Sequence, residues 1–240
     1  MKSPEDLISD LNYSDPTTHC FVDCIDVLKP LGGNLVGIYK QRLDACDLKL
    51  RFAAKSLLEI RRIVSELEHG EFIYFDDANR LSMSFYVESF VIFLRSTLDL
   101  EISAYYLYFS SKSDIDSFND FIKLVGKDQR GDVAMSWLPV NSKNFWFEVH
   151  KDYDSVDPYT WIHALVGTGK GQSLRDLVIH KQSVFVDTYI DADDKGRFYI
   201  GLKKYVEKPL VPWLLLIFQQ VQTIMDKIKD DIMTAERVFR

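Results

Sequence analysis

Residues 84–110 have the sequence SFYVESFVIFLRSTLDLEISAYYLYFS. Its apolar side chains recur every three or four residues, which predicts an α-helix. Aromatic neighbours widen the apolar stripe beyond what one packing partner covers, so we expect the central helix of a bundle. The stripe consists of Val87, Val91, Leu94, Leu98, Ile102, Tyr105 and Phe109, widened by Tyr86, Phe90 and Phe93.

Helical periodicity continues on both sides of this segment. An uninterrupted stripe predicts a long amphipathic helix over 35–67, and the stretch 114–125 predicts a shorter one. Within the aromatic stretch 131–170 we expect two brief helices, one of them capped by Asp157 and begun by Pro158. Pro209 and Pro212 open a last long helix.

Between 174 and 209 the pattern changes. Ser173 is the expected N-cap of a helix over 174–180, after which apolar residues alternate with a period of two. Val184, Val186, Thr188 and Ile190 then face Phe198, Ile200 and Leu202, which predicts a β-hairpin insertion near residues 183–206. The predicted fold is therefore all-α, a bundle of about four long helices with short extra helices and this hairpin.

The domain organisation follows from the prolines near the start. Pro4, Pro16, Pro30 and the pair Gly32–Gly33 break any long helix there, so we expect residues 1–33 to form an N-terminal strap. Residues 34–240 are expected to form a single helical domain.

Composition limits the possible functions. The chain has 240 residues, 47% of them hydrophobic, and a net charge of −7, so it has a real core but lacks the positive field of a general nucleic-acid binder. It lacks a stretch of roughly 20 apolar residues, so no membrane association is expected. Three cysteines without a disulfide pattern favour a reduced, cytoplasmic protein.

One short motif carries chemistry: Arg175-Asp-Leu-Val-Ile-His180. Here the chain resembles the HEPN superfamily, in which an arginine, a following polar residue and, after three more residues, a histidine lie on a late helix of a four-helix bundle. The resemblance of fold covers about 35–240. It implies a dimeric, metal-independent endoribonuclease, often a toxin or defence effector paired with an antitoxin protein, with Arg175, Asp176 and His180 in catalysis.

The residue types suit that reaction. Histidine moves protons near neutral pH, and an arginine fork stabilises charge on phosphorus oxygens without a metal or cofactor. Asp176 lies one helical turn from His180, whereas Arg175 is about 140° away around the helix, so we expect two copies to complete each site. Residues 170–208 contain eight basic and six acidic side chains, and Lys170 and Lys181 are expected to bind RNA.

Other interpretations stay open. A non-catalytic module with the same fold would use this region to bind a nucleotide or a protein partner. The glycine-rich segment 167–171 is either a phosphate loop or, more simply, a flexible connection. His19, Cys20 and Cys24 lack an evident fourth ligand, so no metal site is predicted. Asp99 is expected to pair with Arg95 or, alternatively, with Arg175. The two histidines without an obvious partner, His150 and His163, are interpreted as structural.

Overall fold

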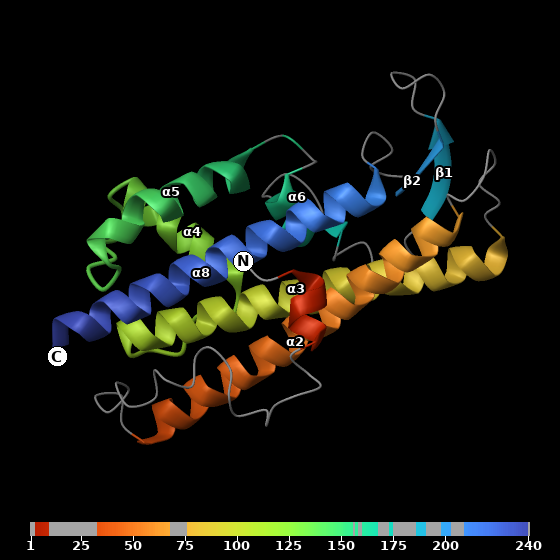
Figure 1. Cartoon of the computed structure of the whole chain (residues 1–240). Helices are drawn as coiled ribbons and strands as arrows, with labels where there is room; N and C mark the ends of the chain where they lie inside the picture. The colour runs from red at the N-terminus through yellow and green to blue at the C-terminus, as the bar shows by residue number, and fades with distance from the viewer. Residues whose placement is uncertain are drawn as a thin grey trace.

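A computed structural model describes residues 3–9, 33–67, 76–155, 157, 160–167, 173–174, 186–190, 198–202 and 209–239. Within these ranges the chain is almost entirely helical, which confirms the all-α prediction (Figure 1). The elements are α1 (Pro4–Ser9), α2 (Gly33–Leu67), α3 (Asp77–Ser110), α4 (Phe118–Gln129), α5 (Val140–Asp154), α6 (Trp161–Leu165), β1 (Val186–Ile190), β2 (Phe198–Leu202) and α8 (Leu210–Phe239).

Three long helices form the framework. α2, α3 and α8 have 35, 34 and 30 residues, and α2 packs against α3 in an antiparallel hairpin while α8 contacts both (Figure 1). α4 and α5 pack on each other beside α3 and α8, and α6 contacts α3, α5 and α8. α3 therefore occupies the centre of the bundle, as its broad apolar surface predicts. The fourth main helix expected over 174–180 lies, after Leu174, outside the described residues.

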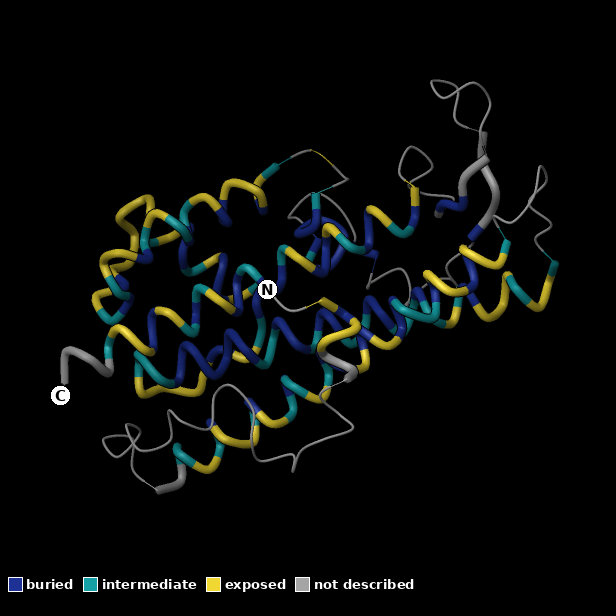
Figure 2. The backbone as a smooth tube through the Cα atoms, viewed as in Figure 1, coloured by how far each residue is buried: buried dark blue, intermediate teal, exposed yellow. Residues whose placement is uncertain are grey.

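The core follows the apolar stripes. Figure 2 shows buried positions recurring along the inner faces of α2, α3 and α8. The aromatic stretch 137–161 mainly fills this core, since Trp146 is fully buried and Tyr153 and Trp161 nearly so. The largest fully buried side chains are Trp146, Tyr39, Tyr105, Phe90, Phe118, Phe121 and Phe218.

Two strands lie at the end of the bundle where α8 begins. β1 and β2 pair antiparallel, with Val186 opposite Leu202 and Ile190 opposite Phe198. β1 contacts α3, and β2 contacts α8. Residues 191–197, which connect the strands, lie outside the described residues.

Several helices begin where polar side chains cap them. α3 begins at Asp77, seven residues before the expected start, because Asp76 Oδ1 accepts a hydrogen bond from Asn79 N at 2.7 Å. α4 spans 118–129 rather than 114–125, because Ser117 supplies the N-cap. The prediction that Asp157 and Pro158 begin a helix is wrong: Thr160 Oγ1 accepts from His163 N, and α6 starts at Trp161.

Only part of the predicted N-terminal strap, residues 1–33, lies within the described residues. α1 packs against α2, where Glu5 forms an ion pair with Arg61. Residues 10–32, including His19, Cys20 and Cys24, lie outside the described residues. The division into a strap over 1–33 and a single domain over 34–240 stays a prediction.

Candidate functional site

The predicted catalytic residues, Arg175, Asp176 and His180, lie outside the described residues, as do Lys170 and Lys181. The structure does describe the two residues that precede the motif. Ser173 is non-helical and fully buried, and Leu174 is helical and 2% exposed within the main core. The motif therefore follows directly from a residue anchored in the core.

Gly167, the first residue of the glycine-rich segment 167–171, terminates α6. Gly167 has a φ of 76°, and its N–H donates to the carbonyl oxygens of Ile162 and His163 at 3.1 and 3.2 Å. Glycine adopts this left-handed conformation without steric cost, so it suits the position directly after Val166, the C-cap of α6. Gly167 thus has a structural role, and the remainder of the segment, 168–171, lies outside the described residues.

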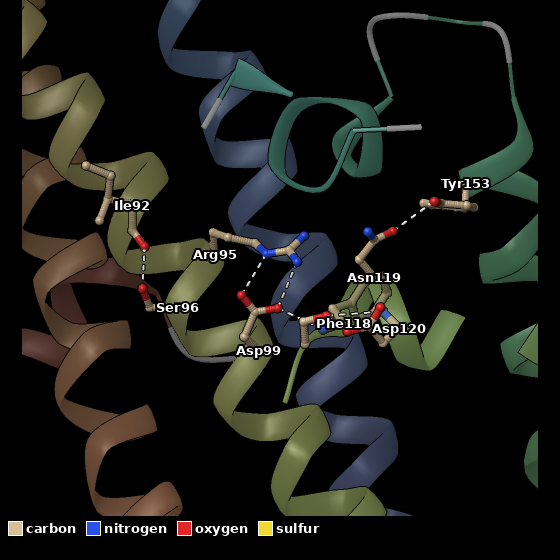
Figure 3. Close-up of polar contacts among 9 residues, drawn as sticks. Ile92, Arg95, Ser96, Asp99, Phe118, Asn119, Asp120 and Tyr153 are labelled. Carbon is tan, nitrogen blue, oxygen red and sulfur yellow. Dashed lines mark hydrogen bonds and ion pairs between the residues drawn. The ribbon is translucent and has the colours of Figure 1, made fainter. Parts of the chain in front are cut away.

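A cluster of polar side chains lies where α3, α4 and α5 meet (Figure 3). Arg95 and Asp99 form the expected ion pair through two contacts of 2.9 Å, Nε to Oδ2 and Nη2 to Oδ1. Asp99 Oδ1 also accepts from the backbone N–H of Phe118 at 2.7 Å. Asp99 therefore neutralises a buried guanidinium and satisfies an N–H of the first turn of α4.

One nitrogen of the Arg95 guanidinium has no acceptor. Its Nη1 is buried and has no hydrogen-bond partner. On the neighbouring helices, Tyr153 Oη donates to Asn119 Oδ1 at 2.8 Å, beside the guanidinium (Figure 3). Burial raises the pKa of Tyr153, assisted by the charge of Asp154 and opposed by that of Arg95. Because Nη1 is covered, this cluster joins helices and does not present a ligand site.

A buried carboxyl lies between α2 and α3. Cys46 Sγ donates to Glu101 Oε2 at 3.1 Å, both side chains are buried, and Glu101 Oε1 has no hydrogen-bond partner. Burial raises the pKa of Glu101 to about 7. Burial and the charge of Glu101 raise the pKa of the Cys46 thiol well above its ordinary value, so this cysteine stays protonated and is a poor nucleophile.

A second buried carboxylate joins three helices. Asp231 of α8 accepts from Tyr105 Oη of α3 at 2.8 Å, from Ser142 Oγ of α5 at 2.5 Å and from Lys227 Nζ at 2.5 Å. Trp146 Nε1 in turn donates to Tyr105 Oη at 3.4 Å. Burial and the charge of Asp231 raise the pKa of Tyr105 far above its ordinary value, so Tyr105 remains a donor.

The sequence did not identify the partners of these two carboxyl groups. Glu101 and Asp231 each lie on the buried arc of an otherwise apolar helix, one position before Ile102 and Ile232 respectively. An acidic residue on the buried side of a helix was the available signal in the sequence. Their partners come from other helices, which the sequence does not identify.

The two histidines are buried, in agreement with their structural interpretation. The expectation that His150 has no partner is wrong. Its Nδ1 lies 3.6 Å from Asp154 Oδ2, one turn along α5.

Comparison with protein-family models, curated protein sequences and solved structures finds no significant match to this chain. None of the helices among the described residues is long and apolar enough to cross a membrane. The described polar clusters are structural, so the motif after Leu174 remains the strongest candidate for chemistry.

Proposed function

We propose that the protein is a metal-independent endoribonuclease of HEPN-like architecture, acting in the cytoplasm as a toxin or defence effector. The motif Arg175, Asp176 and His180 carries this proposal. Three features support it: a helical bundle, the attachment of the motif to the core through Leu174, and the local excess of basic residues over 170–208.

In the proposed reaction the 2′-oxygen of a nucleotide attacks the adjacent phosphorus, and the bond from phosphorus to the 5′-oxygen breaks. His180 transfers the protons, taking one from the 2′-hydroxyl and supplying one to the leaving 5′-oxygen. Arg175 stabilises the charge that builds on the phosphorus oxygens, Asp176 orients His180, and Lys170 and Lys181 hold the RNA backbone. The products carry a 2′,3′-cyclic phosphate and a 5′-hydroxyl.

The test is cleavage of a mixed RNA pool by the purified chain. We expect His180→Ala and Arg175→Ala each to reduce cleavage by at least about 100-fold, a typical share of one general acid–base group or oxyanion donor. Arg130→Ala is the matched control, because Arg130 is exposed and pairs with nearby Asp132 among the described residues. EDTA should leave the rate unchanged, and an RNA with a 2′-deoxy nucleotide at the cleavage position should resist.

Cleavage that persists in folded His180→Ala, or in the 2′-deoxy substrate, would refute this mechanism. Binding of RNA, a nucleotide or an antitoxin without any cleavage by the wild-type chain would instead favour the non-catalytic module.

A further inference from the structure

The apolar core of the bundle has two separate parts. The main core contains the buried residues of α2 from Cys46 onward, whereas earlier buried residues of α2 belong to a smaller cluster, which we call the satellite core. Within the described residues, only α2 and α3 contribute to it, and α3 lies between the start of α2 and α8 (Figure 1). The satellite core consists of Tyr39, Leu43, Ala104 and Leu107, with Leu35, Val36, Ile38 and Tyr108 partly buried against it.

The two cores meet at a polar pair. Cys46 Sγ donates to Glu101 Oε2 at 3.1 Å and lies 3.6 Å from the carbonyl oxygen of Thr97. Glu101 is fully buried, and its Oε1 has no hydrogen-bond partner. Along α2 the pair falls between Leu43 of the satellite core and Leu50 of the main core. The apolar contact between α2 and α3 is therefore interrupted by a carboxyl group whose described donor is a thiol.

The described residues provide no positive charge that would balance an ionised Glu101. On α2, Arg42 pairs with Asp116 at 3.2 Å, and Arg51 pairs with Asp47 at 2.8 Å. The pKa of Glu101 is raised by burial and lowered by the neighbouring thiol, and no described charge of α2, α4, α5 or α8 shifts it. A buried carboxylate without a cation is much less stable than the neutral acid. Ionisation of Glu101 therefore weakens the contact between α2 and α3.

Release of the start of α2 is the smallest change that gives Glu101 access to water. It exposes the buried side chains of the satellite core, whereas unfolding exposes the whole main core as well. Arg42 also joins this part of α2 to the carbonyl oxygen of Ser103 and to Asp116, but a pair with a 79% exposed carboxylate contributes little. α1 packs further along α2, where it pairs with Arg61 of the main-core half. Local release therefore costs less than unfolding.

We propose that Glu101 is a proton-operated latch: the protonated carboxyl holds residues 33–45 of α2 on α3, and its ionisation releases them while the main core stays folded. The inference goes beyond the proposed function, because it uses no residue of the catalytic motif and applies whether or not the protein cleaves RNA.

Hydrogen–deuterium exchange of the full chain tests the latch, with rates corrected for the intrinsic effect of pH. The pKa of Glu101 is about 7 in the closed form against an ordinary value of 4.5, so the closed form loses stability as pH rises between these values. Protection of amides 37–45 should therefore fall at least about ten-fold between pH 5 and pH 7. At each pH these amides should also exchange at least about ten-fold faster than amides 53–64 of the same helix, which lie in the main core.

Two variants complete the test. Glu101→Gln has no proton to lose, so protection of amides 37–45 should become independent of pH. Glu66→Gln is the matched control and should behave as wild type, because Glu66 is an exposed carboxylate of α2 that pairs with Arg62.

The wild-type chain alone can overturn the proposal, whether or not either variant folds. Protection of amides 37–45 that is constant from pH 5 to pH 7, or equal to that of amides 53–64, would do so. A dependence on pH that persists in folded Glu101→Gln would also overturn it.

Discussion

The thiol of Cys46 lies 3.1 Å from a carboxyl oxygen of Glu101, and both side chains are buried between α2 and α3. The described contacts give this carboxyl a hydrogen-bond donor but no cation. Transfer of a charged carboxylate into such surroundings is unfavourable, so the neutral form is favoured. Glu101 therefore makes the bundle sensitive to pH.

The first prediction concerns this sensitivity. The pKa of Glu101 rises from its ordinary value of 4.5 to about 7 on folding. Between these values the unfolded chain loses the proton and the folded chain keeps it, so the free energy of unfolding falls as pH rises, by up to about 3 kcal/mol. Glu101→Gln removes the ionisable group, so this fall in the free energy of unfolding should disappear. Relative to wild type, the variant should gain about 3 kcal/mol of stability between pH 4 and pH 8.

Urea unfolding at several pH values measures this difference, with Glu148→Gln on the exposed face of α5 as the control. A difference between Glu101→Gln and wild type that does not change with pH would contradict the assignment.

The second prediction concerns Asp231, which accepts hydrogen bonds from Tyr105, Ser142 and Lys227. Asp231→Asn removes the charge that these donors stabilise and should lower the free energy of unfolding by about 2–4 kcal/mol. Asp230→Asn changes an exposed neighbour and should alter stability by less than about 0.5 kcal/mol. Equal effects of the two substitutions would show that the buried network contributes nothing.

A double-mutant cycle separates the ion pair from the rest of this network. Lys227→Met should cost less in the Asp231→Asn background than in wild type, by about 1 kcal/mol, because its partner charge is already gone. Additive effects would contradict the direct contact.

The third prediction compares two glycines inside helices. A Cβ at Gly126 of α4 would overlap the imidazole of His150 on α5, whereas a Cβ at Gly37 of α2 meets nothing within 4 Å. Gly126→Ala should therefore destabilise the protein by about 1–3 kcal/mol through overpacking. Gly37→Ala should instead stabilise it by about 0.5–1 kcal/mol, because alanine favours the helix.

The pair Gly126 and His150 can also be tested together. His150→Ala frees the space that Cβ needs, so the cost of Gly126→Ala should largely disappear in that background. Thermal unfolding measures all four proteins. A Gly126→Ala variant as stable as wild type would show that α4 and α5 do not pack this closely.

The long helices were predictable because their apolar side chains keep one period over many turns, as in α2 and along the inner face of α8. Helix starts were less predictable, since one hydroxyl or carboxylate decides each of them: Asp76 extends α3 and Thr160 begins α6. The pair of His150 and Asp154 was missed because a brief helix was expected where α5 runs over 15 residues.

The candidate site depends on a different kind of signal in the sequence. Arg175, Asp176 and His180 are proposed from residue type and spacing, which are local properties of the sequence. The partners of Glu101 and Asp231 lie 55 and 89 to 126 residues away in the chain, apart from Lys227, so only the folded structure brings them together. A local motif can thus be proposed from the sequence alone, whereas contacts assembled from several helices cannot.

The order of the long helices has a consequence for biosynthesis. The α2 and α3 hairpin leaves the ribosome before α8, which begins 100 residues after the end of α3 and covers part of the apolar inner surface of the hairpin. During that interval Phe90, which meets Phe218 of α8 at a ring separation of 6.4 Å, lacks this partner. Until the last helix emerges, the nascent chain therefore exposes apolar surface that favours aggregation.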